Sequence, residues 1–107
     1  VVIESVKTGA LLFHGGGVFA APAFPLDNVV DPTGAGDSFA GGLMGYLAAT
    51  GDTSPESLRS ALVVGTVLAS YSVEDFSLDR FRRLDVAQIR ARTHAFSELV
   101  RFPNPKI

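Results

Sequence analysis

The feature that most restricts the fold of this chain is a run of small residues that opens an apolar helix. Residues 31–42 read DPTGAGDSFAGG, and Gly34, Ala35 and Gly36 come directly before Asp37. From Ser38 onward, apolar residues recur at spacings of three and four, which predicts a helix that ends near residue 50. A glycine-rich turn at a helix N-terminus presents unpaired N–H groups and the positive end of the helix dipole, so the run favours an anion such as phosphate.

Asp37 is the acidic residue nearest to this predicted anion site. A carboxylate beside a bound anion weakens binding because like charges repel, and its presence therefore indicates a chemical role. The alternative for an isolated Gly-x-Gly-Asp is a turn followed by an acid that interacts only with the helix dipole. Gly41, Gly42 and Gly45 each cost the same helix about 1 kcal/mol relative to Ala, which indicates close approach of a neighbouring strand or a ligand.

Residues 31–44 resemble, position by position, the C-terminal signature of the ribokinase-like (PfkB-type) carbohydrate kinases. The resemblance implies that Asp37 is the general base that takes the proton from an acceptor hydroxyl, and that the amides of Gly34, Ala35 and Gly36 form an anion hole. It implies ATP-dependent phosphoryl transfer to a hydroxyl of a sugar or related small molecule, in which catalysis is mostly positioning and electrostatic stabilisation.

Other phosphate-binding motifs fit the run less well. No Gly-Lys-Ser/Thr follows the glycines, which excludes a P-loop, and Phe39 replaces the third glycine of a dinucleotide-binding fingerprint.

The resemblance also implies the cofactors. We expect ATP with Mg²⁺ carried on the nucleotide phosphates, and Lys7 and Gly9 beside the nucleotide. Many family members have a glycine where this chain has Val6, and a β-branched side chain there narrows the approach to the nucleotide.

A monovalent cation, usually K⁺, is bound in this family with help from the positions that match Asp31 and Thr33. A simple turn role for Asp31 ahead of a proline is equally open. Residues 71–76, which should supply the remaining cation ligands, lack the expected glycine.

The first 24 residues predict strands. Residues 1–5 and 10–14 are short β-rich runs, residues 18–24 are again extended, and Gly15–Gly17 between two apolar runs predicts a hairpin turn. Pro22 and Pro25 are typical of an edge strand or a departing loop.

Three helices follow the strands. Gly51 ends the first, Ser54 caps a second that runs to about Val73, and Asp85 with Gln88 can form a capping box for a third. The second helix is apolar on most faces, which predicts burial between layers. The third has a single apolar face and predicts a surface helix that packs on a sheet; that face comprises Val86, Ile89, Thr93, Phe96 and Val100.

Strands followed by helices of these lengths predict an α/β layered architecture. The resemblance implies the ribokinase-like three-layer fold, with a mainly parallel central sheet of which this chain forms one edge. With 107 residues the chain can bury one modest core.

Because complete ribokinase-like enzymes are much longer, we expect residues 1–107 to be the C-terminal, nucleotide-side portion of such a kinase. The acceptor portion and its lid would lie N-terminal to it, and the isolated chain would be inactive. The alternative is a non-catalytic binding module that retains an anion or nucleotide site.

Charge and composition narrow the class of partner. The net charge of −2 offers no electrostatic basis for nucleic-acid binding, and the absence of cysteine excludes disulfides and thiol catalysis. The longest apolar runs are about 11 residues, too short to span a bilayer. We expect a cytoplasmic protein whose partner is a sugar or nucleoside acceptor, with a homo-oligomer left open.

Basic residues crowd the C-terminal part of the chain, and we interpret them as a solvated helical face; they are Arg80, Arg82, Arg83, Arg90, Arg92, Arg101 and Lys106. The adjacent acids Glu74 and Asp75 are interpreted as a solvated helix end rather than a metal site.

Overall fold

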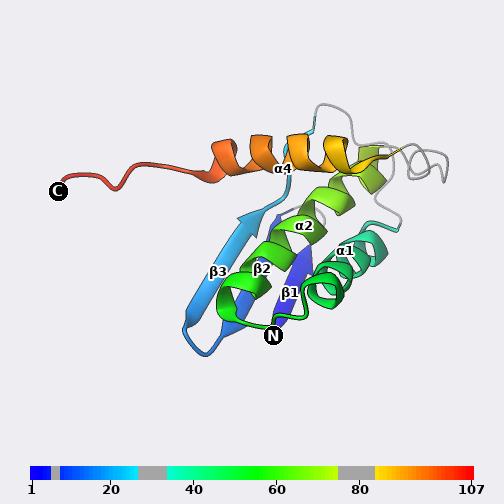
Figure 1. Cartoon of the computed structure of the whole chain (residues 1–107). Helices are drawn as coiled ribbons and strands as arrows, with labels where there is room; N and C mark the ends of the chain where they lie inside the picture. The colour runs from blue at the N-terminus through cyan, green and yellow to red at the C-terminus, as the bar shows by residue number, and fades with distance from the viewer. Residues whose placement is uncertain (6–7, 27–33, 75–83) are drawn as a thin grey trace.

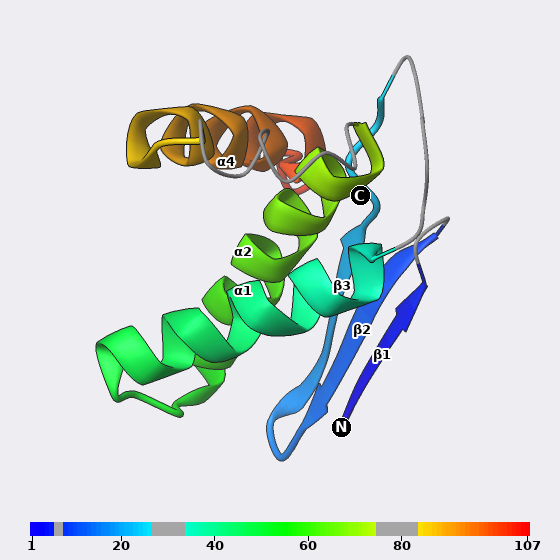
Figure 2. The ribbon, with the colours of Figure 1, turned by 90° about the vertical axis from the view of Figure 1, so that its right-hand side faces the viewer.

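The computed structural model describes residues 1–5, 8–26, 34–74 and 84–107 (Figure 1). These parts of the chain form three strands and then three helices, which agrees with the predicted α/β order. The elements are β1 (Val2–Ser5), β2 (Gly9–His14), β3 (Gly17–Pro22), α1 (Ala35–Thr50), α2 (Pro55–Glu74) and α4 (Val86–Val100). Figure 2 shows α1 and α2 on the same face of the sheet.

The strands pair in chain order, β1-β2-β3, and both pairings are antiparallel. His14 pairs with Gly17, so Gly15 and Gly16 form the two-residue turn that the glycine run predicted. A tight hairpin makes neighbouring strands antiparallel, so the part of the sheet described here differs from the mainly parallel sheet that the resemblance implies for the complete fold.

The ends of α1 and α2 are where the sequence predicted them. Gly51 has φ +63°, the left-handed conformation that glycine adopts easily, and its N–H donates to the Leu47 carbonyl at 2.8 Å. The Ser57 amide donates to Ser54 Oγ at 3.3 Å, which confirms Ser54 as the cap of α2.

Helix α2 is the centre of the core. It packs against α1, α4, β2 and β3, and its Leu62 and Val67 are fully buried. From the sheet, Ala10, Leu12 and Ala21 face these residues in the same cluster. The predicted burial of the second helix is therefore confirmed.

Two glycines allow α1 and α2 to cross at close range. A Cβ on Gly65 would lie 2.7 Å from the Phe39 carbonyl oxygen, and a Cβ on Gly42 would lie 3.1 Å from Gly65 Cα. The close neighbour of Gly42 is therefore a helix, not the strand or ligand that the sequence suggested. Gly41 and Gly45 have no neighbouring atom within 4 Å of a Cβ position.

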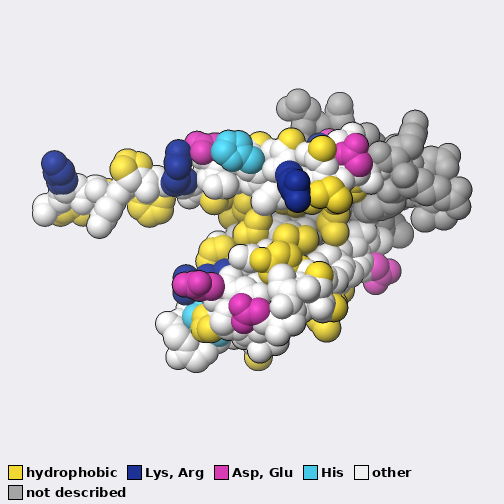
Figure 3. Space-filling view, viewed as in Figure 1, with side chains coloured by type: hydrophobic (Ala, Val, Ile, Leu, Met, Phe, Trp, Pro, Cys, Tyr) yellow, Lys and Arg dark blue, Asp and Glu magenta, His cyan; other side chains and the backbone are white. Residues whose placement is uncertain are grey.

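Helix α4 begins at the predicted capping box. Asp85 Oδ1 accepts from the Gln88 amide at 2.8 Å, and the Asp85 amide donates to Gln88 Oε1 at 3.0 Å. The helix packs mainly against α2, and its Phe96 stacks on Phe24 with 6.0 Å between ring centroids. Figure 3 shows apolar side chains gathered where α4 meets the rest of the molecule.

The prediction that this helix packs on a sheet is thus wrong about its partner. Phe96 of α4 belongs to the same apolar cluster as Val67 and Tyr71 of α2, and Ile89 of α4 packs against that cluster, so α4 is stabilised by covering α2. Val86 and Val100, at the two ends of the expected apolar face, remain exposed.

We predict that Gly65→Ala lowers the free energy of unfolding by about 1–3 kcal/mol, because the new methyl would overlap the Phe39 backbone. Gly45 lies in α1 with open space around its Cβ position. Gly45→Ala should therefore raise the free energy of unfolding by about 0.5–1 kcal/mol through helix propensity. Urea unfolding of both variants measures the difference. Equal effects would contradict the crossing described here.

Candidate active site

The N-terminus of α1 has the geometry that an anion site requires. Gly34 has φ +84° and no side chain that could cap the helix; its carbonyl accepts from the Ser38 amide at 3.0 Å, so no Gly34 side chain covers the amides of Ala35, Gly36 and Asp37. Ala35 is fully buried, whereas Gly34 and Gly36 are exposed. The buried residue anchors the turn, and the two glycines leave its backbone open to solvent.

Two polar side chains flank this turn. A Cβ on Gly36 would lie 3.9 Å from Glu4 Oε2, and a Cβ on Gly34 would lie 3.8 Å from Ser72 Oγ. The N-terminus of α1 therefore lies between β1 and the last turns of α2.

Asp37 occupies the third position of α1 and is exposed. Phe39, two residues further, is buried in the core. The helix is therefore held from its inner face while the Asp37 carboxylate remains accessible to an incoming molecule.

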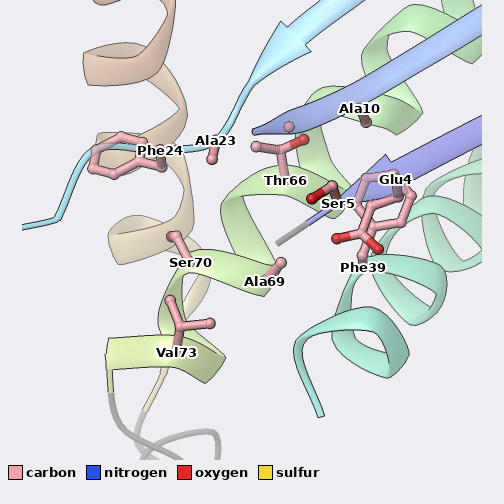
Figure 4. Close-up of a pocket in the computed structure, with 11 residues that line it drawn as sticks. Glu4, Ser5, Ala10, Ala23, Phe24, Phe39, Thr66, Ala69, Ser70 and Val73 are labelled. Carbon is pink, nitrogen blue, oxygen red and sulfur yellow. The ribbon is translucent and has the colours of Figure 1, made fainter. Parts of the chain in front are cut away.

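A pocket of about 40 Å³ lies beside this helix end (Figure 4). Phe39 links the two, because it belongs to α1 and lines the pocket. The lining is mostly apolar and comes from five parts of the chain; it comprises Glu4, Ser5, Gly9, Ala10, Ala23, Phe24, Phe39, Thr66, Ala69, Ser70 and Val73.

Gly9 is the predicted nucleotide residue that the structure places in this pocket. Its φ is +112°, and a Cβ would overlap the Ala21 carbonyl oxygen and lie 2.7 Å from Pro22 Cα. Close packing of β2 on β3 therefore requires glycine here, whatever else the residue does. Lys7, Val6, Asp31 and Thr33 lie outside the described residues.

The described residues contain no cluster of three or more side chains that could hold a metal ion. Glu74 forms an ion pair with Arg92 at 3.1 Å, so its interpretation as a solvated helix end is wrong, while Asp75 lies outside the described residues. Among the helices that the structure describes, none has the length and apolar character needed to cross a bilayer.

Sequence reasoning missed two residues near the pocket. The sequence pattern predicts Glu4 only as part of a strand, but Glu4 lines the pocket. It predicts Arg92 as one of the solvated basic residues, but the Arg92 side chain is only 17% exposed. A signal for Arg92 was present, because it lies three residues after Ile89 and four before Phe96, on the buried side of α4.

Comparison with known proteins identifies the family. Residues 1–80 match the family model described as pfkB family carbohydrate kinase. The chain belongs to the pfkB family of carbohydrate kinases. Its fold is ribokinase-like, as the resemblance implied.

Individual pfkB-type kinases are similar over most of the chain. Inositol 3-kinase of Arabidopsis thaliana is 33% identical over 90 residues, which cover 84% of this chain and 24% of that protein. Aminoimidazole riboside kinase from Salmonella enterica, solved with aminoimidazole riboside and an ATP analog, has a TM-score of 0.70 and 30% identity, covering 84% of this chain and 30% of that one. A ligand-free nucleoside kinase from Burkholderia thailandensis has a TM-score of 0.69 and 25% identity, covering 86% and 28%. The chain thus spans only 24–30% of the length of these relatives.

Proposed function

We propose that this chain carries the catalytic base and the phosphate-binding turn of an ATP-dependent kinase that phosphorylates a hydroxyl of a sugar or related small molecule. The observation that supports this most is the uncapped glycine N-terminus of α1, with the exposed Asp37 in its first turn and a pocket alongside. Membership of the pfkB family supports the same class of reaction.

In this proposal Asp37 accepts the proton of the acceptor hydroxyl as that oxygen bonds to the γ-phosphorus and the bond to ADP breaks. The amides of Gly34, Ala35 and Gly36 donate hydrogen bonds to the transferred group, whose charge the helix dipole also stabilises. Because these amides belong to the N-cap and first turn of a helix anchored by buried Ala35 and Phe39, we expect them to need little rearrangement when the charge develops.

The nucleotide would lie over the mouth of the pocket beside α1, which at about 40 Å³ is too small to enclose it, with its phosphates at the glycine turn and Gly9 nearby. A contact with Lys7 stays a prediction. The aminoimidazole riboside kinase with an ATP analog supports ATP as the donor.

Mg²⁺ fits this arrangement as an ion carried on the nucleotide. Glu4 and Asp37, near the N-terminus of α1, have carboxylate oxygens of the kind that Mg²⁺ prefers. The described residues contain no group of three side chains that could hold the ion without the nucleotide. When bound, the ion would neutralise phosphate charge. A K⁺ site at Asp31 and Thr33 stays a prediction.

The acceptor pocket and its lid would belong to a further, N-terminal portion of the enzyme. The relatives named above include kinases of inositol, of aminoimidazole riboside and of nucleosides, so we propose an acceptor with several hydroxyls, a polyol or a riboside. We further propose a cytoplasmic location, where ATP is available, and no nucleic-acid or membrane partner. Formation of a homo-oligomer stays a prediction.

The second candidate is a non-catalytic module that binds ATP without transferring phosphate. The small share of each relative that the chain spans, 24% for inositol 3-kinase, favours this candidate for the chain in isolation.

ATP with Mg²⁺ should protect the isolated chain from heating, while a kinase assay with a panel of sugars and nucleosides should show no phosphate transfer. A purely structural fragment would show no protection.

In the full-length enzyme, Asp37→Asn should lower turnover by about 100-fold to 10,000-fold, because an amide cannot accept the hydroxyl proton. Asp52→Asn is the matched control, since Asp52 is an exposed acid just beyond the other end of α1. Its turnover should be unchanged. An Asp37→Asn enzyme with wild-type turnover would remove Asp37 from the mechanism.

Gly34→Ala tests the anion hole separately from the base. Gly34 and Gly51 both have positive φ, +84° and +63°, so alanine at either should destabilise the fold by about 1 kcal/mol. Only Gly34→Ala should also reduce the rise in melting temperature that ATP with Mg²⁺ produces. If both variants respond to ATP equally, the turn does not bind phosphate.

A further inference from the structure

We propose that Arg92 of α4 is a positioning residue for nucleotide binding, which it supports by fixing the pocket wall formed by Phe24 and Ser70. The inference rests on the proposed function, because it takes the pocket beside α1 to be one part of the nucleotide site. Arg92 itself does not line the pocket; it acts through two residues that do.

Arg92 joins α4 to the last turns of α2 through directed hydrogen bonds. Its Nη2 donates to Glu74 Oε1 at 3.2 Å and to Oε2 at 3.1 Å, and its Nη1 donates to Ser70 Oγ at 3.0 Å. The pair with Glu74 is partly buried, with 17% and 31% of the two side chains exposed, so solvent screens it less than a surface pair.

The guanidinium also contacts two aromatic rings. Its Cζ lies 3.7 Å from the centroid of the Tyr71 ring and 5.2 Å from that of Phe24. Phe96, one turn further along α4, stacks on Phe24 as well. Phe24 therefore fixes the segment after β3 against α4. The same contacts fix the edge of the pocket that Phe24 forms.

Ser70 is oriented by the same contact. Its hydroxyl donates to the Val67 carbonyl at 2.5 Å and accepts from Arg92, so both its hydrogen and one lone pair are engaged. Phe24 and Ser70 belong to segments far apart in the chain, and Figure 4 shows both at the side of the pocket nearer α4. One arginine thus sets the relative position of two pieces of the pocket wall.

Arginine is required for this geometry. A planar guanidinium can bind both oxygens of a carboxylate with one nitrogen, reach a hydroxyl with another and place its face near aromatic rings, which a lysine ammonium cannot do in the same fixed geometry. We therefore predict that nucleotide affinity falls in steps. Arg92→Lys should bind the nucleotide more weakly than the unsubstituted enzyme, and Arg92→Met more weakly still.

The test is steady-state kinetics of the full-length enzyme with ATP varied and acceptor saturating. Arg92→Met should raise the KM for ATP roughly tenfold, the order expected when a charge-assisted contact is lost, while kcat stays within about twofold. The KM for the acceptor should not change. Arg101→Gln is the matched control, because Arg101 follows the same helix but pairs with Glu98 at an exposed position, and its KM for ATP should stay at the parent value.

Three outcomes would overturn the inference. A folded Arg92→Met enzyme with an unchanged KM for ATP would show that the wall does not need Arg92, and a fall in kcat alone would show a merely structural role. Failure of the unsubstituted protein to bind ATP would overturn the proposed function and this inference together. If Arg92→Met does not fold, Arg92→Lys and Phe24→Leu provide the same comparison, and each should raise the KM for ATP.

Discussion

The close crossing of α1 and α2 is the contact on which the rest of the structure depends. Neither Gly42 nor Gly65 has a side chain, so the two helices meet backbone to backbone, with Phe39 packed directly over Gly65. Phe39 lies in the second turn of α1, so this contact fixes the entry of the helix. The glycine turn is thereby placed between Glu4 of β1 and Ser72 of α2.

Helix α2 and the pocket connect this crossing to α4. Phe39 lines the pocket, Phe24 and Ser70 form part of its wall, and Arg92 binds both. A helix that lies beyond the 1–80 match to the pfkB family model thus supports a pocket formed by residues within it. Different elements position the proposed phosphate turn and the proposed nucleotide pocket, but α2 packs against both.

Local signals in the sequence predicted most of the elements correctly. The hairpin at Gly15 and Gly16, the left-handed Gly51 and the capping box at Asp85 each depend on a few neighbouring residues, and all are confirmed. The glycine turn at Gly34, for which phosphate binding stays a proposal, was also recognisable, because its spacing to Asp37 is local. The partner of α4 and the role of Arg92 were not predictable in this way, since they depend on which apolar faces meet after folding.

The sequence by itself thus determined where helices and strands begin and end, and it placed the glycine turn that we propose binds phosphate at the start of α1, because hydrogen-bond capping and glycine conformation act over a few residues. Only the tertiary structure decided that Gly42 meets a helix, that α4 covers α2, and that Arg92 is a partly buried link and not a solvated charge. The reason is physical: burial and close packing join residues far apart in the chain, and no local pattern states which surfaces will touch.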